Sequence, residues 1–292
     1  MLCVSLTAPT TRDMLAELRR AGAQADLAEL RLDYMRECDL AVLLVARRCP
    51  VIVTNRPTRE GGRYAGREGD RVRPLRQAAE LGAEHIDIEH DAIRLMRDRG
   101  QSKLILSYQN FDETPPDLWH IYEWLRDQGA DIVKIAAMAR HVKDCLLAFD
   151  VLRRADVPTI ALCMGPAGIL TRILARRFGA YLTFATFGDG PVSGPGQLTL
   201  GEMRDVYRAH SIGAETRLFG LVGPVANASP ALPWVNDALR EAGADAVCVP
   251  VQTTDGVTEV QEELAPLGLA GLVADGLTRE EAATQASTWL SG

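Results

Sequence analysis

The sequence predicts an α/β protein, a (β/α)8 TIM barrel followed by a small C-terminal α/β module. Short apolar runs rich in β-branched residues alternate with helical patterns as far as residue 212. Such alternation builds right-handed βαβ units and a parallel sheet. Eight strands in about 210 residues is the count of a compact barrel. An open doubly wound sheet is the alternative, but no glycine-rich phosphate turn follows the first strand.

The predicted barrel elements follow in order along the chain. The strands are Leu2–Ala8, Leu27–Tyr34, Val51–Arg56, His85–His90, Lys103–Asn110, Ile132–Ala137, Thr159–Gly165 and Tyr181–Phe187. Apolar residues recur at helical spacing between them, which predicts helices in Thr11–Ala21, Arg73–Leu81, Pro116–Gln128, Val142–Arg154 and Gly168–Arg177. We therefore assign residues 1–212 to the barrel.

Residues 213–292 are predicted to form the second module. Its expected strands are Arg217–Gly223, Ala246–Gln252 and Leu269–Ala274, and its expected helices are Pro233–Ala242, Glu259–Leu264 and Arg279–Leu290. A unit of about 75 residues is marginal alone. We expect it to pack on the barrel or to form the surface of a homodimer.

Composition narrows the classes of partner and compartment. The net charge is −7 and no basic tract stands out, which argues against a nucleic-acid or anionic-membrane partner. A small anionic substrate remains compatible, since it needs only one or two arginines. The six cysteines are scattered without a CxxC pair, which favours reduced thiols in the cytoplasm. Met1–Ala8 is too short for a signal peptide, and no apolar run reaches membrane-spanning length.

Lys134 lies in an apolar run, Ile132–Ala137, that is typical of a buried strand. Lysine is rarely fully buried without a reason. An amine taken out of water holds its proton less tightly and can attack a carbonyl carbon. The alternative is an edge-strand lysine whose head group reaches solvent.

The barrel hypothesis also predicts which polar groups point inward. Outer strand faces meet helices and are apolar, so polar residues within strands face the barrel axis. The inward set is Glu29, Arg31, Asp33, Thr54, Arg56, Asp87, Glu89, Ser107, Gln109 and Lys134. Asp33 lies past its strand end and is expected to reach solvent. Glu29, Asp87 and Glu89 balance Arg31, Arg56 and Lys134, as a buried polar cluster requires.

Six ordered motifs now support a resemblance. They are Glu29-Leu-Arg-Leu-Asp33, Arg56-Pro-Thr-Arg-Glu-Gly-Gly62, Ser107-Tyr-Gln-Asn-Phe111 with Thr114-Pro115, Asp131-Ile-Val-Lys-Ile-Ala136, Met164-Gly-Pro-Ala-Gly-Ile-Leu-Thr-Arg172 and Ser193-Gly-Pro-Gly-Gln197. Residues 1 to about 205 thereby resemble type I 3-dehydroquinate dehydratase, a (β/α)8 Schiff-base enzyme of the shikimate pathway. The resemblance implies the substrate 3-dehydroquinate and neither a cofactor nor a metal.

The resemblance also implies roles for individual residues. Lys134 would form an imine with the substrate ketone, which acidifies the adjacent C–H so that water can be eliminated. Arg172 would hold the substrate carboxylate, for which a planar guanidinium is suited. The glycine- and proline-rich loop 188–197 would be a lid. The residues expected to contact substrate are Glu29, Arg31, Arg56, Met164, Arg172, Ser193 and Gln197.

One position departs from the family pattern. The family places a proton-shuttling histidine where this chain has Gln109, and a glutamate at the Glu60 position orients that histidine. An amide cannot carry a proton at neutral pH, and losing a general acid–base group costs about 10²- to 10⁴-fold in rate. The alternatives are His141, in the loop after the Lys134 strand, and Glu60 itself. His90 is expected to face outward by alternation.

The tail carries a second, weaker resemblance. Residues 217–279 resemble the substrate-binding part of shikimate dehydrogenase, but only Ser229 of two expected serines remains, and no nucleotide-binding domain follows. We expect neither dehydrogenase activity nor NADP binding.

Three functions thus stay open. The first is 3-dehydroquinate dehydratase through Lys134, impaired by Gln109. The second is an inactive barrel that binds a shikimate-pathway metabolite or a partner. The third is another class I Schiff-base lyase or aldolase.

Overall fold

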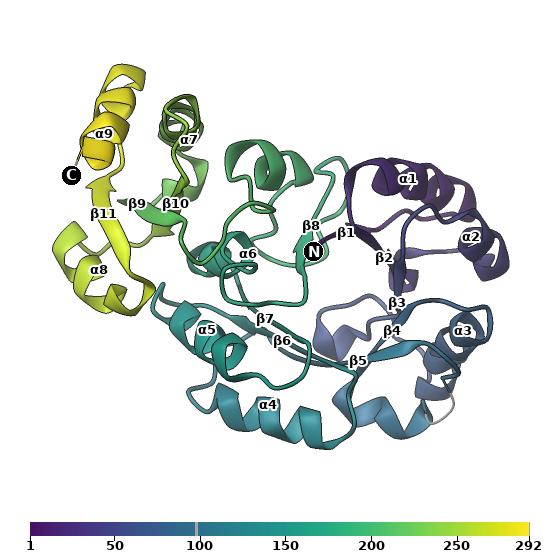
Figure 1. Ribbon diagram of the computed structural model, residues 1–292. Helices are drawn as coiled ribbons and strands as arrows, with labels where there is room; N and C mark the ends of the chain where they lie inside the picture. The colour runs from purple at the N-terminus through teal and green to yellow at the C-terminus, as the bar shows by residue number, and fades with distance from the viewer. Residues whose placement is uncertain (97–98, 292) are drawn as a thin grey trace.

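Eight parallel strands form the nearly closed barrel of Figure 1. The structure is a computed structural model that describes residues 1–96 and 99–291. The strands run in the order β7-β6-β5-β4-β3-β2-β1-β8. Their bounds are β1 Leu2–Leu6, β2 Leu27–Arg31, β3 Val51–Thr54, β4 His85–Glu89, β5 Lys103–Asn110, β6 Ile132–Met138, β7 Thr159–Met164 and β8 Thr183–Ala185. Between β7 and β8, the Tyr181 amide donates to the Thr159 carbonyl over 2.8 Å. The predicted barrel is confirmed.

The barrel interior has an apolar floor and a polar upper layer. Inward positions recur every second residue, so the first inward residues of several strands form one layer. That floor contains Cys3, Leu27, Ile52, Ile105, Ile132, Ile160 and Phe184. The inward residues two positions later include the buried polar residues Ser5, Glu29, Thr54, Asp87, Ser107 and Lys134, together with apolar Leu162 of β7. Sequence periodicity therefore places the polar side chains toward the carboxyl ends of the strands.

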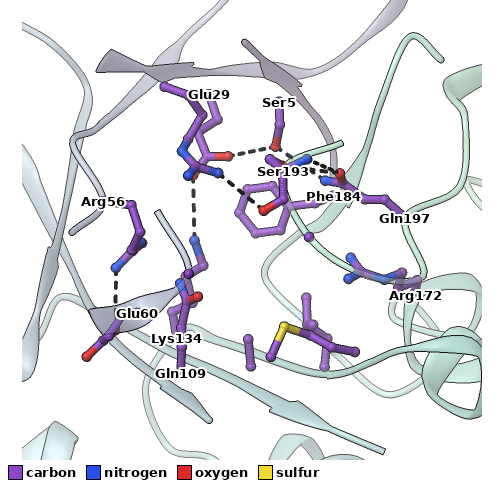
Figure 2. Close-up of a pocket in the computed structure, with 16 residues that line it drawn as sticks. Ser5, Glu29, Arg56, Glu60, Gln109, Lys134, Arg172, Phe184, Ser193 and Gln197 are labelled. Carbon is purple, nitrogen blue, oxygen red and sulfur yellow. Dashed lines mark hydrogen bonds and ion pairs between the residues drawn. The ribbon is translucent and has the colours of Figure 1, made fainter. Parts of the chain in front are cut away.

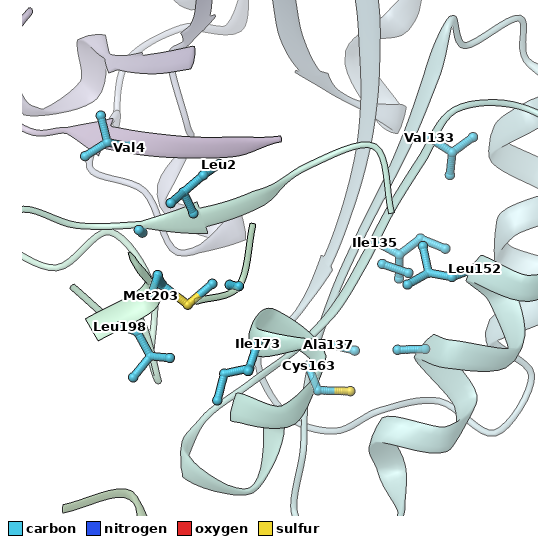
Figure 3. Packing of buried hydrophobic residues seen from close by; sticks show 14 of the residues in the cluster. Leu2, Val4, Val133, Ile135, Ala137, Leu152, Cys163, Ile173, Leu198 and Met203 are labelled. Carbon is cyan, nitrogen blue, oxygen red and sulfur yellow. The ribbon is translucent and has the colours of Figure 1, made fainter. Parts of the chain in front are cut away.

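Helices cover the outer face of the barrel (Figure 1). Their bounds are α1 Thr11–Gln24, α2 Leu40–Ala46, α3 Glu68–Glu80, α4 Leu118–Asp127, α5 Asp144–Arg154 and α6 Ile169–Ile173. Outward residues such as Val133 and Ile135 of β6 belong to the same apolar cluster as Leu152 of α5 (Figure 3). Burial of these side chains contributes about 25 cal/mol per Å² of apolar surface.

The structure differs from the prediction in three helices. Helix α2 has no counterpart in the prediction, because its seven residues give too short a periodic pattern. Helix α6 ends at Ile173 rather than Arg177. Helix α3 begins at Glu68 rather than Arg73. The segment after β8, where the sequence predicts no helix, forms a π-helical turn, Glu202–Val206. None of these differences moves a strand.

The C-terminal module has a three-stranded parallel sheet in the order β10-β9-β11. Its elements are β9 Arg217–Gly223, α7 Ala231–Glu241, β10 Ala246–Gln252, α8 Val257–Glu263, β11 Leu269–Ala274 and α9 Arg279–Ser291. Leu218, Val247 and Val249 share one apolar cluster with the barrel, while Phe219 and Cys248 pack with α7 and α9. The module is thus joined to the barrel by a continuous core. No helix in residues 1–96 and 99–291 is long and apolar enough to cross a membrane.

Candidate active site

A cavity opens at the carboxyl end of the barrel. Figure 2 shows that its side chains come from several strands and from the loop after β8. All ten residues that the sequence assigned to the site line it: Glu29, Arg31, Arg56, Glu60, Gln109, Lys134, Met164, Arg172, Ser193 and Gln197. The structure therefore brings the whole predicted set together around one cavity.

Lys134 stands on β6 with its side chain only 7% exposed. Its Nζ donates to Oδ2 of Asp87 over 2.6 Å and lies 3.6 Å from Oε1 of Glu29. The ring centroid of Phe184 lies 4.5 Å from the same nitrogen. The edge-strand alternative is wrong, since the amine is buried among carboxylates and borders the cavity.

A buried ionic network lies behind Lys134. Arg56 donates to Asp87 and to Glu89, each over 2.6 Å. Burial opposes ionisation of Asp87, but Arg56 and then Lys134 outweigh it and hold the pKa of Asp87 well below its usual range. Arg71 of α3 pairs with the other oxygen of Glu89 over 2.6 Å. Sequence reasoning missed Arg71 because it lies on a helix, where a charged residue is normally exposed.

Asp33 does not reach solvent, so that expectation is wrong. Its side chain is 0% exposed and forms two hydrogen bonds with Arg31, of 2.9 and 2.8 Å. Asp33 lies just past the end of β2, in a 3-10 turn over Leu32–Tyr34. The bidentate pair fixes the Arg31 guanidinium, which also donates to the Ser193 carbonyl over 3.4 Å.

Arg172 presents a buried cation without an anionic partner among the residues that the structure describes. It is 3% exposed, and burial lowers its pKa to about 10. One Nη donates to the Pro195 carbonyl over 3.2 Å, while Nε has no hydrogen-bond partner in the described part of the chain. Burying an unpaired charge is costly. A bound carboxylate would relieve that cost. Met164 borders the same cavity as an apolar wall.

The loop 188–197 lies over the cavity and is tied to the barrel. Ser193 donates through its amide and its hydroxyl to Oε1 of Gln197, over 3.2 and 3.1 Å. The Gln197 amide in turn donates to the Ser5 hydroxyl over 3.5 Å (Figure 2). Gly196 has φ +71°, and a Cβ there would lie 2.5 Å from the Gly165 carbonyl oxygen. The glycine therefore permits this close approach of the loop.

Gln109 connects Glu60 to Arg56. In the amide orientation that satisfies both its atoms, its nitrogen donates to the Glu60 carbonyl over 3.1 Å. Its oxygen then accepts from Nε of Arg56 over 3.2 Å. Glu60 follows β3 in the 3-10 turn Thr58–Glu60 and borders the cavity. Burial raises the pKa of Glu60 to about 8, with Arg56 opposing.

The histidines fall outside the cavity lining. His141 is exposed and borders a different cavity, formed with the C-terminal module. His85 lies at the opposite end of its strand and shares a 2.9 Å hydrogen bond with Tyr181. His90 packs against the rings of Tyr108 and Trp124, in keeping with its expected outward position.

Ser5 and Phe184 are among the cavity residues that the sequence did not assign to the site. Ser5 donates to Glu29 over 2.6 Å, and Phe184 lies beside the lysine. Ser5 is a polar residue within the apolar run of β1, which is the same signal that identified Lys134. Phe184 gave no such signal, because an aromatic residue in a strand is ordinary core.

Comparisons with known proteins agree on one family. The family model "Type I 3-dehydroquinase" matches residues 2–214. A 3-dehydroquinate dehydratase of Desulfotalea psychrophila is 36% identical over 219 residues, covering 70% of this chain and 96% of that protein. A bifunctional 3-dehydroquinate dehydratase/shikimate dehydrogenase of Arabidopsis thaliana is 36% identical over 262 residues, covering 85% of this chain. That match spans only 43% of the bifunctional relative.

The comparison of folds identifies the same family as the comparison of sequences. The crystal structure of a 3-dehydroquinate dehydratase from Geobacillus kaustophilus superposes with a TM-score of 0.63 at 27% identity, covering 70% of this chain and 88% of that one. With the barrel, the polar cavity and these relatives in agreement, the chain belongs to the type I 3-dehydroquinase family.

Proposed function

We propose that this protein is a 3-dehydroquinate dehydratase of the shikimate pathway, working through an imine on Lys134. The observation that carries the proposal is the placement of the buried Lys134 amine and the unpaired Arg172 guanidinium on one cavity. The substrate offers a ketone for the amine and a carboxylate for the guanidinium. The named relatives support the same reaction.

The chemistry follows from the lysine. Its amine attacks the ketone carbon, and loss of water gives a protonated imine. The imine withdraws electrons from the neighbouring carbon, whose proton a base removes to give an enamine. Return of the enamine electrons expels the hydroxyl group as water once an acid protonates it. Hydrolysis of the remaining imine releases the product and restores Lys134.

The other cavity residues would position the substrate. Arg172 would hold the carboxylate, and Met164 would pack against the ring. Carboxylates hold the guanidinium groups of Arg31 and Arg56 in place. The hydroxyl groups of Ser5 and Thr54 hold the carboxylate of Glu29 in place. These fixed groups and the lid residues Ser193 and Gln197 would bind hydroxyl groups without further ordering cost.

Two measurements test the proposal. Purified protein mixed with 3-dehydroquinate is expected to produce the ultraviolet absorbance of 3-dehydroshikimate. Borohydride added during turnover is expected to leave a reduced adduct, which peptide mass spectrometry locates on Lys134. Turnover without an adduct would sink the imine route, and the absence of turnover would sink the enzyme assignment.

A specific observation favours a second candidate. Gln109 cannot carry a proton, and both its polar atoms are engaged by Arg56 and Glu60. On this alternative the barrel binds a shikimate-pathway metabolite and forms an imine without completing elimination. A borohydride adduct on Lys134 without product would identify it. A third reading, another class I lyase or aldolase, is tested by a panel of ketone substrates.

The C-terminal module is proposed to be a degenerate relative of the shikimate dehydrogenase substrate domain. The Arabidopsis match, which covers 85% of this chain and so extends beyond residue 214, supports this. A cytoplasmic location is supported by the six free cysteines. A homodimer stays a prediction, which size-exclusion chromatography with light scattering tests.

A further inference from the structure

The site lacks an obvious proton carrier at position 109, but two polar atoms without hydrogen-bond partners lie close by. Oε2 of Glu60 and Nδ1 of His90 are both buried, and neither has a hydrogen-bond partner among the described residues. The other carboxylate oxygen of Glu60 lies 3.8 Å from that same Nδ1. Unpaired buried polar atoms are costly, so such a pair calls for an explanation.

His90 lies next to Glu60 on one side and is partly exposed to solvent. Its ring is held between Trp124, at a centroid distance of 4.8 Å, and Tyr108, at 5.9 Å. Its side chain is 24% exposed, whereas that of Glu60 is 8% exposed. Glu60 borders the cavity and His90 does not. Glu60 thus lies between the cavity and a histidine that is in contact with solvent.

We propose that Glu60 and His90 together replace the missing proton carrier, with Glu60 exchanging a proton with the substrate and His90 exchanging it between Glu60 and solvent. The inference rests on the dehydratase function proposed above. His90 is a positioning and relay residue, since it acts only through Glu60. A small rotation of the ring closes the 3.8 Å gap.

Glu60 removes a proton from the substrate and later returns the same proton to the leaving hydroxyl group. As a carboxylate it removes one proton from the carbon beside the protonated imine. The C–H electron pair forms the enamine double bond, and the imine pair moves onto nitrogen. Glu60 then gives that proton to the leaving hydroxyl while the nitrogen pair re-forms the imine and the C–O bond breaks. Water leaves and Glu60 is a carboxylate again.

His90 is needed because Glu60 is too buried to exchange protons freely. Burial raises the pKa of Glu60 to about 8, with Arg56 opposing the shift and Glu89, Asp91 and Asp87 adding to it. Near neutral pH the carboxyl is therefore largely protonated and must lose that proton before it can act as a base. His90, whose Nδ1 lies 3.8 Å from the carboxylate, accepts that proton and passes it to water.

Gln109 contributes by holding the pair in place. Its amide joins the Glu60 backbone to Arg56, which forms an ion pair with Oε2 of Glu60 over 3.8 Å. The glutamine therefore fixes the turn that carries the carboxylate without supplying a proton itself.

The first test compares His90→Asn with His141→Asn. An asparagine nitrogen can occupy the place of Nδ1 but cannot carry a proton. We expect kcat of His90→Asn to fall about 10²-fold with KM within twofold of the wild type. His141 is exposed and lies on another cavity, so His141→Asn is expected to keep full activity. The borohydride adduct on Lys134 is expected to form in both variants.

Two rescue experiments separate a relay from a structural role. Added imidazole is expected to raise kcat of His90→Asn in proportion to its concentration, because it carries the proton from solution, and to leave the wild type unchanged. The double variant His90→Asn/Gln109→His is expected to recover turnover, because a titrating ring then lies beside Glu60.

The outcomes are distinct. An active wild type whose kcat is unchanged by His90→Asn would overturn the relay and leave the dehydratase function standing. Loss of the Lys134 adduct in His90→Asn, with no response to imidazole, would also overturn it by showing a structural role. A wild type without turnover would overturn the proposed function and the relay together.

Discussion

The barrel sheet and the module sheet are both parallel, and both bury polar side chains, but they use them differently. In the module, buried Asn236 of α7 makes all its hydrogen bonds internally, donating to Leu232 and Cys248 and accepting from the Cys248 amide over 2.9–3.0 Å. In the barrel, Arg172 and Glu60 are also buried, yet each keeps a polar atom without a hydrogen-bond partner in the described chain and borders a cavity.

The difference teaches how to separate structural from functional polar groups. A buried group whose hydrogen bonds are complete cross-links its neighbours and stabilises the fold. A buried group left unpaired at a cavity costs stability, so its presence points to a ligand or a proton that completes it. Substitutions in the barrel site are therefore expected to change turnover, and substitutions in the module to change stability.

The largest expected effect is in the barrel. Lys134→Ala is expected to abolish turnover and the borohydride adduct, because no other amine borders the described cavity. Lys103→Ala is the matched control, since Lys103 is exposed at the start of β5. Product absorbance and mass spectrometry check both variants. A Lys134→Ala protein that still turns over would place the reactive group elsewhere.

Arg172→Leu sharpens the comparison, because the activity is expected to fall while the stability is unchanged or rises. Losing a charge-assisted contact to the substrate carboxylate, of about 1.5–3 kcal/mol, lowers kcat/KM by roughly 10- to 10²-fold. Removing an unpaired buried charge leaves the melting temperature unchanged or raised. Steady-state kinetics and thermal denaturation measure the two, with exposed Arg176→Leu as the control. A large drop in melting temperature would show that Arg172 is already paired.

The pH dependence of Glu60 is the third test. Its pKa is raised from 4.5 to about 8, so the native state holds a proton that the unfolded state has released across this range. The contribution of Glu60 to the free energy of unfolding is therefore fully present below pH 4.5 and is lost as pH rises through about 8. Relative to Glu60→Gln, the wild type is expected to lose unfolding free energy between pH 5 and pH 8. Urea titrations at several pH values measure this, and parallel curves would contradict the shift.

The smallest effect on activity is expected in the module. Asn236→Ala leaves the amide and carbonyl of Cys248 without their partner, at a cost of about 1–3 kcal/mol for each unpaired group. Thermal denaturation is expected to show the loss, while kcat/KM stays within twofold of the wild type. Ser287→Ala on α9 is the control, because Ser287 is exposed. A loss of activity as large as that of Arg172→Leu would give the module a part in the site.

The prediction from sequence succeeded where the information is local. Strand alternation and the period of two put Glu29, Asp87 and Lys134 on one interior layer, because successive side chains of a strand point to opposite faces. The strand order followed from the rules for βαβ units. Helix α2 escaped because seven residues carry too little periodicity.

Tertiary structure decided what depends on contacts between distant segments. Arg71 on a helix and Asp33 past a strand end look exposed in sequence, yet each pairs with a buried charge because the fold closes over it. His90 was expected to face outward, and it does contact the rings of Tyr108 and Trp124. Only the tertiary structure shows that it also lies beside Glu60. The sequence by itself determined the barrel and its inward lysine, since both follow from residue-by-residue alternation. Only the tertiary structure decided which groups meet, because burial and pairing arise when separate strands and loops are brought together.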